Sequence, residues 1–296
     1  EEVRRLASEA DVLIENFKTG GLAKYGLDYD SLREINPRLV YCSITGFGQD
    51  GPYAKRAGYD FIIQAMSGIM DLTGDPAGEP QKIGVAFADI FTGLYSVIAI
   101  QAALLQRAET ERGQHIDMAL LDCMVGVLAN QGLNYLSSGE SPTRMGNRHP
   151  NIAPYEALPV ADGWFILAVG NDRQFRRFCE LVGLDGMADD ERFDTNAARV
   201  EYRDELTAQI SEATRQWKRD ELLAALEDTR VPAGPINTVE QAFADPQTRF
   251  REMQLLLDRA GGAAVPGIRT PIRFSEAELE VDTPAPALGD NTPDWR

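Results

Sequence analysis

The sequence predicts an α/β protein with two domains. In the first part of the chain, short apolar segments alternate with amphipathic helical patterns, which is typical of a parallel sheet with helical crossovers. A linker rich in Gly, Pro, Asn and Ser follows at residues 137–155, and the pattern then changes to a strand pair around a tight turn. The length of 296 residues is sufficient for two such domains.

The first part of the chain divides into strands and helices by apolar periodicity. The segment DVLIE at 11–15 has an apolar centre and predicts a buried parallel strand. Pro37 ends a short helix before the strand LVYCSI. We expect helices at 1–10, 22–25, 31–35 and 61–70, strands at 11–15, 39–44 and 115–119, and one long helix at 120–137.

The second part has a different order of elements. Two apolar segments flank the turn 161–163 and predict a hairpin. We expect hairpin strands at 155–160 and 164–169, helices at 172–182, 202–214 and 219–226, a loop, strand and short helix within 231–246, and closing strands within 255–274.

The central feature is the run from Ile83 to Gln106, because Asp89 is its one ionisable side chain. Residues 83–88 predict a strand or extended lead-in, and residues 93–106 predict a long, largely buried helix, so Asp89 lies near the helix start. There it would remain ionised at neutral pH, favoured by the helix dipole. Two interpretations follow: Asp89 only caps the helix, or it is a nucleophile in a dry pocket.

Composition excludes several classes of function. A formal charge of −17 and a pI near 4.6 argue against nucleic acid or an anionic membrane as partner. Polar residues interrupt 83–106, which argues against a membrane span, and nothing resembles a signal peptide. The scattered Cys42, Cys123 and Cys179 indicate reduced core thiols of a cytoplasmic protein, and two histidines make a metal site improbable.

The motifs of common catalytic sites are absent from the sequence. It contains no P-loop, HExxH, paired CxxC or GxSxG. The remaining candidates are Asp89, the turn after Glu15, the Gly-rich loop leading to Asp60, and the segment MGNRHP at 145–150.

Together these segments resemble the family III CoA-transferases, also called the CaiB/BaiF family. The resemblance extends over essentially the whole chain and is closest to the branch of succinyl-CoA:glutarate and related dicarboxylate CoA-transferases. It is carried by segments such as ENFKTGGLAKYGLDYDSL, GVAFADIFTGLYS and RGQHIDMALLD. The matching segments lie at 15–32, 35–70, 84–96, 112–122, 155–175, 190–200, 231–247 and 286–295.

The resemblance implies a catalytic role for Asp89 and a binding site for CoA. Asp89 occupies the position of the nucleophile that forms an anhydride and then an aspartyl-CoA thioester. Acyl-CoA is then a substrate, with no permanently bound cofactor and no metal. The implied CoA-binding residues are Asn16, Phe17, Lys18, Lys24, Ala57, Gly58, Tyr59 and Asp60. Lys24 replaces the family's usual Arg, so its phosphate contact should be less rigid.

The resemblance also implies a substrate loop and leaves rival functions open. The loop residues are Gly146, Asn147, Arg148 and His149, and the last two are candidates for binding the distal carboxylate of a dicarboxylic acid. The related α-methylacyl-CoA racemases have a His where this chain has Tyr59. Racemisation is therefore the weaker alternative, and a non-catalytic CoA-binding homologue is another.

The family fold implies a Rossmann-like large domain, a smaller α+β domain and an interlocked, ring-like homodimer. We expect the large domain at 1–146, the small domain at 147–245 and a segment returning to the large domain at 246–296. Relative to the family, the opening strand and the closing helix are missing from the sequence, which would leave the CoA site incomplete if the molecule itself lacked them.

Overall fold

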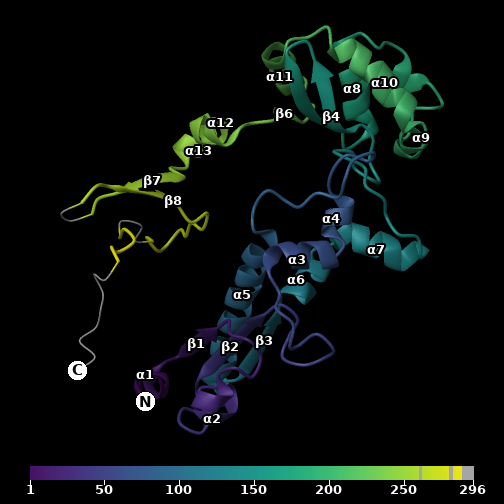
Figure 1. Ribbon diagram of the computed structural model, residues 1–296. Coiled ribbons are helices and arrows are strands. Elements are labelled where there is room, and N and C mark those ends of the chain that lie inside the picture. The colour runs from purple at the N-terminus through teal and green to yellow at the C-terminus, as the bar shows by residue number, and fades with distance from the viewer. Residues whose placement is uncertain (260–261, 280–282, 289–296) are drawn as a thin grey trace. The chain divides into compact units, whose positions relative to one another are not determined.

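The computed structural model describes residues 1–259, 262–279 and 283–288 (Figure 1). The chain divides into two compact units, Glu1–Pro150 and a second that begins at Asn151. The expected return of 246–296 to the large domain stays a prediction, and the matching segment 286–295 lies largely outside the described residues.

The first unit contains a three-stranded parallel sheet in the order β1 (Val12–Glu15), β2 (Val40–Thr45), β3 (His115–Ala119). Its register places Glu15 opposite Ser43, and Thr45 opposite Ala119. The predicted parallel α/β arrangement is thus confirmed. Strand β1 is less buried than expected, since Ile14 is exposed.

The helices of the first unit differ from the prediction at two breaks. The helix expected at 61–70 is divided at Gly68, which has a φ of +90°, and the helix expected at 120–137 is divided at Ala129, which has a φ of +48°. Apolar periodicity continues across both breaks, so it did not indicate them. The helices are α1 (Glu2–Glu9), α2 (Tyr29–Arg33), α3 (Asp60–Met66), α4 (Ile69–Leu72), α5 (Phe87–Thr110), α6 (Leu120–Gly126) and α7 (Ala129–Ser138), with a 3₁₀ turn at Ala23–Tyr25.

Helix α5 runs beside the sheet and packs on β2, β3, α3 and α6 (Figure 1). The prediction that it is largely buried was wrong for this chain, because only Ala88, Thr92, Ser96 and Ala103 are buried. By length and composition α5 is apolar enough to cross a bilayer, with 22% of its most apolar stretch buried. Core helices of globular proteins meet the same criterion.

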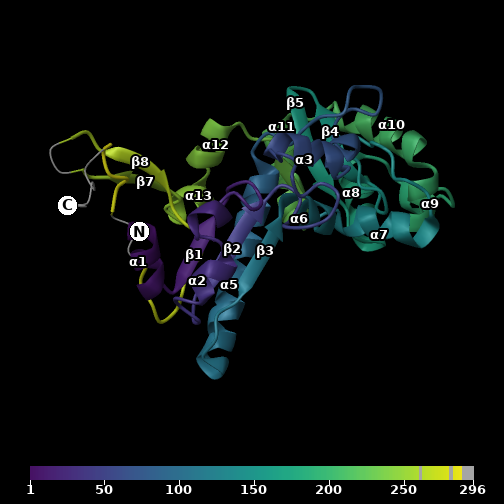
Figure 2. The ribbon, with the colours of Figure 1, turned by 60° about the horizontal axis from the view of Figure 1, so that its bottom comes forward.

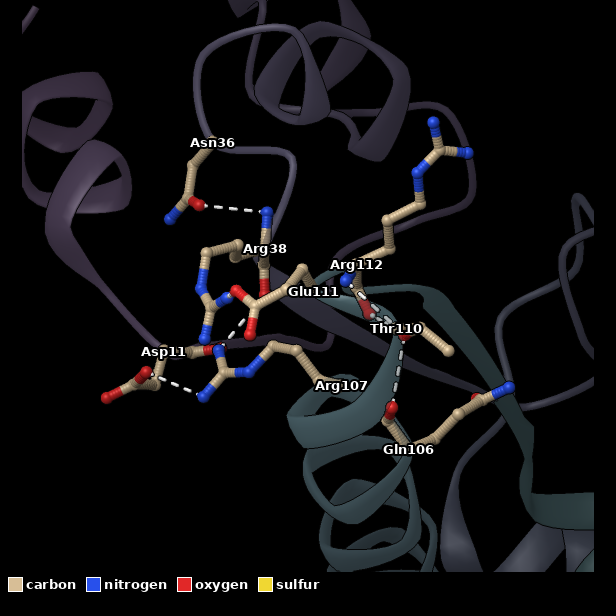
Figure 3. Close-up of polar contacts among 8 residues, drawn as sticks. All are labelled: Asp11, Asn36, Arg38, Gln106, Arg107, Thr110, Glu111 and Arg112. Atoms are coloured by element: carbon tan, nitrogen blue, oxygen red, sulfur yellow. Dashed lines mark hydrogen bonds and ion pairs between the residues drawn. The ribbon is translucent and has the colours of Figure 1, made fainter.

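The C-terminal end of α5 is joined to the segments before β1 and β2 by Arg107 (Figure 3). Its guanidinium donates to the Asp11 carboxylate at 2.7 Å and to the backbone carbonyl of Arg38 at 3.0 Å. Arg38 in turn forms an ion pair with Glu111, the residue that ends the helix with a φ of +59°. This cluster fixes α5 against the segments that lead into β1 and β2.

The near end of α5 lies on a small apolar core. Ile63 of α3, Ala88 of α5, and Leu120 and Met124 of α6 are buried together there. Helices α3, α5 and α6 therefore pack together around Ala88, the residue before Asp89. This packing holds the first turn of α5 in place.

The second unit is built around an antiparallel sheet in the order β4 (Tyr155–Val160), β5 (Gly163–Ala168), β6 (Ala233–Pro235). Figure 2 shows β4 and β5, with α10 (Arg203–Thr214) packed on β4. A core that includes Phe165, Phe175 and Phe178 fills the space between sheet and helices. The other elements are α8 (Asp172–Val182), a 3₁₀ turn at Met187–Asp189, α9 (Asn196–Glu201), α10 (Arg203–Thr214), α11 (Arg219–Asp228), α12 (Val239–Ala244), α13 (Pro246–Phe250) and the hairpin β7 (Gln254–Leu257) with β8 (Val265–Ile268).

The three cysteines are free and buried, as the sequence predicted. Burial raises the pKa of the Cys42 and Cys123 thiols and raises the pKa of Cys179 to about 12. Since the thiolate is the nucleophilic form, none of them is suited to catalysis.

Candidate active site

A pocket of about 650 Å³ opens where the three parallel strands of the first unit end. Asn16 follows β1, Gly46 follows β2 and Leu120 follows β3, and all three line it. Ligands of α/β proteins bind at the carboxyl ends of parallel strands. The lining residues are Asn16, Phe17, Lys18, Thr19, Ile44, Thr45, Gly46, Ala54, Lys55, Arg56, Ala57, Gly58, Tyr59, Asp60, Asp89, Thr92, Gly93 and Leu120.

One wall of the pocket depends on a close contact between Gly46 and Gly58. A Cβ added to Gly46 would lie 2.5 Å from the Cα of Gly58, and a Cβ added to Gly58 would lie 2.4 Å from the Cα of Gly46. Only glycine fits at either position. The contact brings the loop before α3 against the end of β2, and so places Tyr59 and Asp60 at the pocket.

Asp89 lies in the first turn of α5 and faces this pocket, but it does not cap the helix. The cap comes from Asp60, whose Oδ1 accepts the backbone N–H groups of Ala88 at 2.8 Å and Asp89 at 3.3 Å. Among the described residues, no hydrogen bond to the Asp89 carboxylate is found. The capping interpretation of Asp89 was therefore wrong, and its side chain is available for a ligand.

The electrostatic setting of Asp89 differs from the expected one. Partial burial and the negative charge of Asp60 together raise the pKa of Asp89 above its ordinary value. The expected dry pocket is not formed by the described residues, because Asp89 is exposed. The carboxylate is thus open to a ligand and made more basic by its neighbour.

Positive charge gathers around the pocket of this acidic chain. Lys18, Lys55 and Arg56 line it, from the loops after β1 and β2. The Arg56 guanidinium lies 4.4 Å from the ring centroid of Tyr53 and 5.5 Å from that of Phe47, which holds it by cation–π contacts. These cations suit an anionic ligand such as a phosphate.

The structure brings most of the predicted site residues together, although no ligand is present to test their roles. Asn16, Phe17, Lys18 and the run 57–60 line the same pocket as Asp89. Lys24 does not line it; its ammonium lies 4.7 Å from the Tyr25 ring centroid. Gly146, Asn147, Arg148 and His149 are also outside the lining, so the roles of these five residues stay predictions.

Several lining residues were missed from sequence, although a signal for them exists. Thr45 is the last residue of β2, Gly46 follows it and Thr19 lies in the loop after β1, at the strand ends where parallel sheets place ligand contacts. Thr92 and Gly93 lie three and four residues after Asp89, on the same helix face. Both rules point to these positions once the strands and α5 are identified.

The segment that carries the predicted substrate loop is anchored by Arg144. Its guanidinium donates to the carbonyls of Asp71, Asp75 and Gly78 at 3.0 to 3.1 Å and pairs with the Asp71 carboxylate at 3.5 Å. The turn before α5 and the segment after α7 are therefore joined by one side chain.

Fold and pocket together define an α/β protein with an available carboxylate among cations at the ends of parallel strands. The chain belongs to CoA-transferase family III, whose family model matches residues 1–292. This confirms the resemblance found from sequence.

Individual relatives agree with this assignment. The chain is 58% identical to the succinate–glutarate CoA-transferase of Agrobacterium fabrum, over 98% of this chain and 72% of the relative. It is 37% identical to the human succinyl-CoA:glutarate CoA-transferase, over 98% of this chain and 66% of the relative. The chain thus spans about two thirds to three quarters of these relatives.

Solved structures show the same fold. The crystal structure of a CaiB/BaiF family protein from Brucella suis matches with a TM-score of 0.83 and 67% identity, over 96% of this chain and 74% of that one. A protein from Mycobacterium tuberculosis matches with a TM-score of 0.84 and 29% identity, over 95% and 75%.

Proposed function

We propose that this chain transfers CoA from an acyl-CoA to a carboxylic acid, with Asp89 as the nucleophile. The observation that carries the proposal is the free Asp89 carboxylate, which faces a pocket lined by Lys18, Lys55 and Arg56 while Asp60 caps its helix. Carboxylates serve as covalent nucleophiles in proteins, and a raised pKa makes the carboxylate a stronger one.

The proposed cycle uses four attacks and consumes no water. An Asp89 oxygen attacks the thioester carbonyl carbon and the C–S bond breaks. CoA departs as the thiolate, and the donor acyl group is joined to Asp89 as a mixed anhydride. The thiolate attacks the Asp89 carboxyl carbon and releases the donor acid as a carboxylate. The acceptor carboxylate attacks the resulting aspartyl-CoA thioester, forming a second anhydride and releasing thiolate. The thiolate takes the acceptor acyl group and regenerates Asp89, so no resident cofactor or metal is required.

The cations around the pocket support a site for the phosphates of CoA. Lys18 and Arg56 offer the charge, and the exposed Phe17 ring, also in the lining, offers a surface on which adenine can stack. Ala57 and Gly58 leave space for the narrow pantetheine arm towards Asp89. Lys24 adds a further phosphate contact in this proposal.

The names of the relatives support a dicarboxylate pair. The relative from Agrobacterium fabrum is named for succinate and glutarate, the human relative for succinyl-CoA and glutarate, and one from Haloarcula marismortui, 35% identical, for succinyl-CoA and mesaconate. We therefore infer succinyl-CoA as donor and a dicarboxylic acid as acceptor. In this proposal, Arg148 and His149 bind the distal carboxylate, while Gly146 and Asn147 give the loop room to approach.

We also propose that a second copy of the chain covers α5. Leu94, Val97, Ile98 and Leu105 are each more than half exposed, an apolar surface of the kind that marks protein interfaces. Asp89 would be costly in lipid, which favours a protein partner over a membrane. The buried, reduced thiols support a cytoplasmic location.

Intact-mass spectrometry tests the nucleophile directly. The protein is incubated with succinyl-CoA, trapped with hydroxylamine or borohydride, and compared with Asp89→Asn. We expect a modification on Asp89 that the variant lacks, and CoA transfer to glutarate only with the unmodified sequence. CoA binding without any adduct would overturn the transferase mechanism; proton exchange at the substrate α-carbon would then identify the racemase alternative.

A further inference from the structure

The first turn of α5 has no cap of its own. The residue before the helix is Ala86, whose methyl group cannot accept a hydrogen bond, so the first N–H groups need a partner from elsewhere. Asp60 supplies it from the start of α3, accepting the N–H groups of Ala88 and Asp89 with one oxygen. The nucleophile's backbone is thus held by a side chain 29 residues earlier in the chain.

The second oxygen of Asp60 is held by Gln64, which is fully buried. Gln64 Nε2 donates to Asp60 Oδ2 at 2.7 Å, and Gln64 Oε1 accepts the N–H of Ile83 at 2.9 Å. Both Asp60 oxygens therefore have fixed donors. Gln64 thus holds the segment before α5 at Ile83, and Asp60 holds the first N–H groups of α5. The two side chains together fix the backbone before Asp89 and at Asp89 itself.

This arrangement releases the Asp89 carboxylate. An Asp at a helix start commonly turns back to accept backbone N–H groups. Here Asp60 already accepts two of them, including that of Asp89 itself. The Asp89 side chain is left to face the pocket.

The charge of Asp60 acts in the same direction. A second carboxylate nearby disfavours the ionised form of Asp89. Acylation of Asp89 removes its charge and relieves this repulsion, so the covalent intermediates are favoured over the free carboxylate. The other titratable groups around the pocket are Lys18, Lys55, Arg56 and Tyr59.

We propose that Asp60, held by Gln64, is a positioning residue that frees Asp89 for attack and promotes its acylation. This role rests on the proposed function and goes beyond it, because the sequence resemblance implied only a CoA contact for Asp60.

Two variants and a matched control test the proposal. Asp60→Asn removes the charge. The double variant Asp60→Asn with Gln64→Glu keeps a hydrogen bond between the two side chains, with the amide introduced at position 60 as donor. It moves the negative charge from position 60 to position 64, whose side chain makes no hydrogen bond to the backbone of Asp89 among the described residues. The control is Asp245→Asn, since Asp245 caps α13 by accepting two N–H groups at the same 2.8 and 3.3 Å, outside the pocket lining.

The readouts are CoA affinity and the rate of Asp89 acylation by succinyl-CoA as a function of pH. We expect Asp60→Asn to slow acylation at neutral pH at least tenfold when succinyl-CoA saturates the site, so that any loss of CoA affinity is measured separately from the loss of rate. In both Asp60 variants the pH midpoint of acylation should fall, because Asp89 ionises more readily without its charged neighbour. Asp245→Asn should leave rate and midpoint unchanged.

The outcomes separate the two proposals. If unmodified protein is labelled on Asp89 and both Asp60 variants keep its rate and pH midpoint, the positioning role is wrong and the transferase mechanism stands. If unmodified protein binds CoA but is never labelled, the transferase mechanism fails and the positioning role fails with it.

Discussion

Asp60 accepts the backbone N–H of Asp89 at 3.3 Å, so one carboxylate caps the helix and the other is left unbonded beside it. Asp60, 29 positions before Asp89, thus makes the capping contact that was one of the two interpretations of Asp89. The cap that the sequence suggested for Asp89 is supplied by Asp60, which leaves the catalytic role of Asp89 as the proposal that its unbonded carboxylate supports.

Asp89→Asn should raise the melting temperature at pH 7. The folded-state pKa of Asp89 is raised by partial burial and by Asp60. For a group with a raised pKa, its contribution to stability is full below the unfolded pKa of about 3.9 and is lost as pH rises through the folded pKa. The neutral amide avoids this loss, so the gain should shrink from pH 7 to pH 4 in a thermal melting series. A variant less stable than the parent at pH 7 would contradict this.

Gly46→Ala and Gly58→Ala should each damage the pocket. The new Cβ would lie within 2.5 Å of backbone, and overpacking of this kind costs about 1–3 kcal/mol. Urea unfolding should show the loss, and CoA affinity should fall with it. Gly126→Ala is the matched control, because its Cβ meets nothing within 4 Å in the described structure and its φ is not positive. Unchanged CoA affinity in Gly46→Ala would show that the contact does not shape the site.

Arg107→Ala should destabilise the first unit by about 1.5–3 kcal/mol, the range for hydrogen bonds that involve a charged group. The Arg107 side chain is 12% exposed and donates to the Arg38 carbonyl, whereas Asp11 is 79% exposed and its ion pair adds little (Figure 3). Arg33→Ala, which breaks two exposed ion pairs and a contact of the guanidinium with the Tyr29 ring at 5.7 Å, should cost no more than about 1 kcal/mol in the same urea titration. Equal losses in the two variants would place the stabilising contact elsewhere.

Local patterns predicted much of the fold and failed where a single backbone angle decides. Helix α8 has the predicted bounds, Asp172–Val182, because an amphipathic run lies between Asn171, which caps it, and Gly183, which ends it in the left-handed conformation. The positive φ of Ala129 divides α6 from α7, and the sequence has no Gly or Asn at this position that would predict such a backbone angle. The exposure of α5 was missed for another reason. Its apolar composition indicates burial, but it does not show whether the same chain or another molecule covers the helix.

The candidate site was predictable in part. Asp89 stood out as a lone ionisable group, and the loop after β1 and the run 57–60 followed from the resemblance to the family. The capping of α5 by Asp60 and the contact of Gly46 with Gly58 join segments far apart in sequence. Such contacts depend on the tertiary fold, so periodicity and local motifs do not contain them.

The residues that line the Asp89 pocket all lie between Asn16 and Leu120. The pocket is therefore formed by one continuous stretch of the chain. Recombination at any point after α6 would exchange the rest of the chain while passing on Asp89, its Asp60 cap and the pocket cations as a block. We expect the pocket to be inherited intact where later segments diverge.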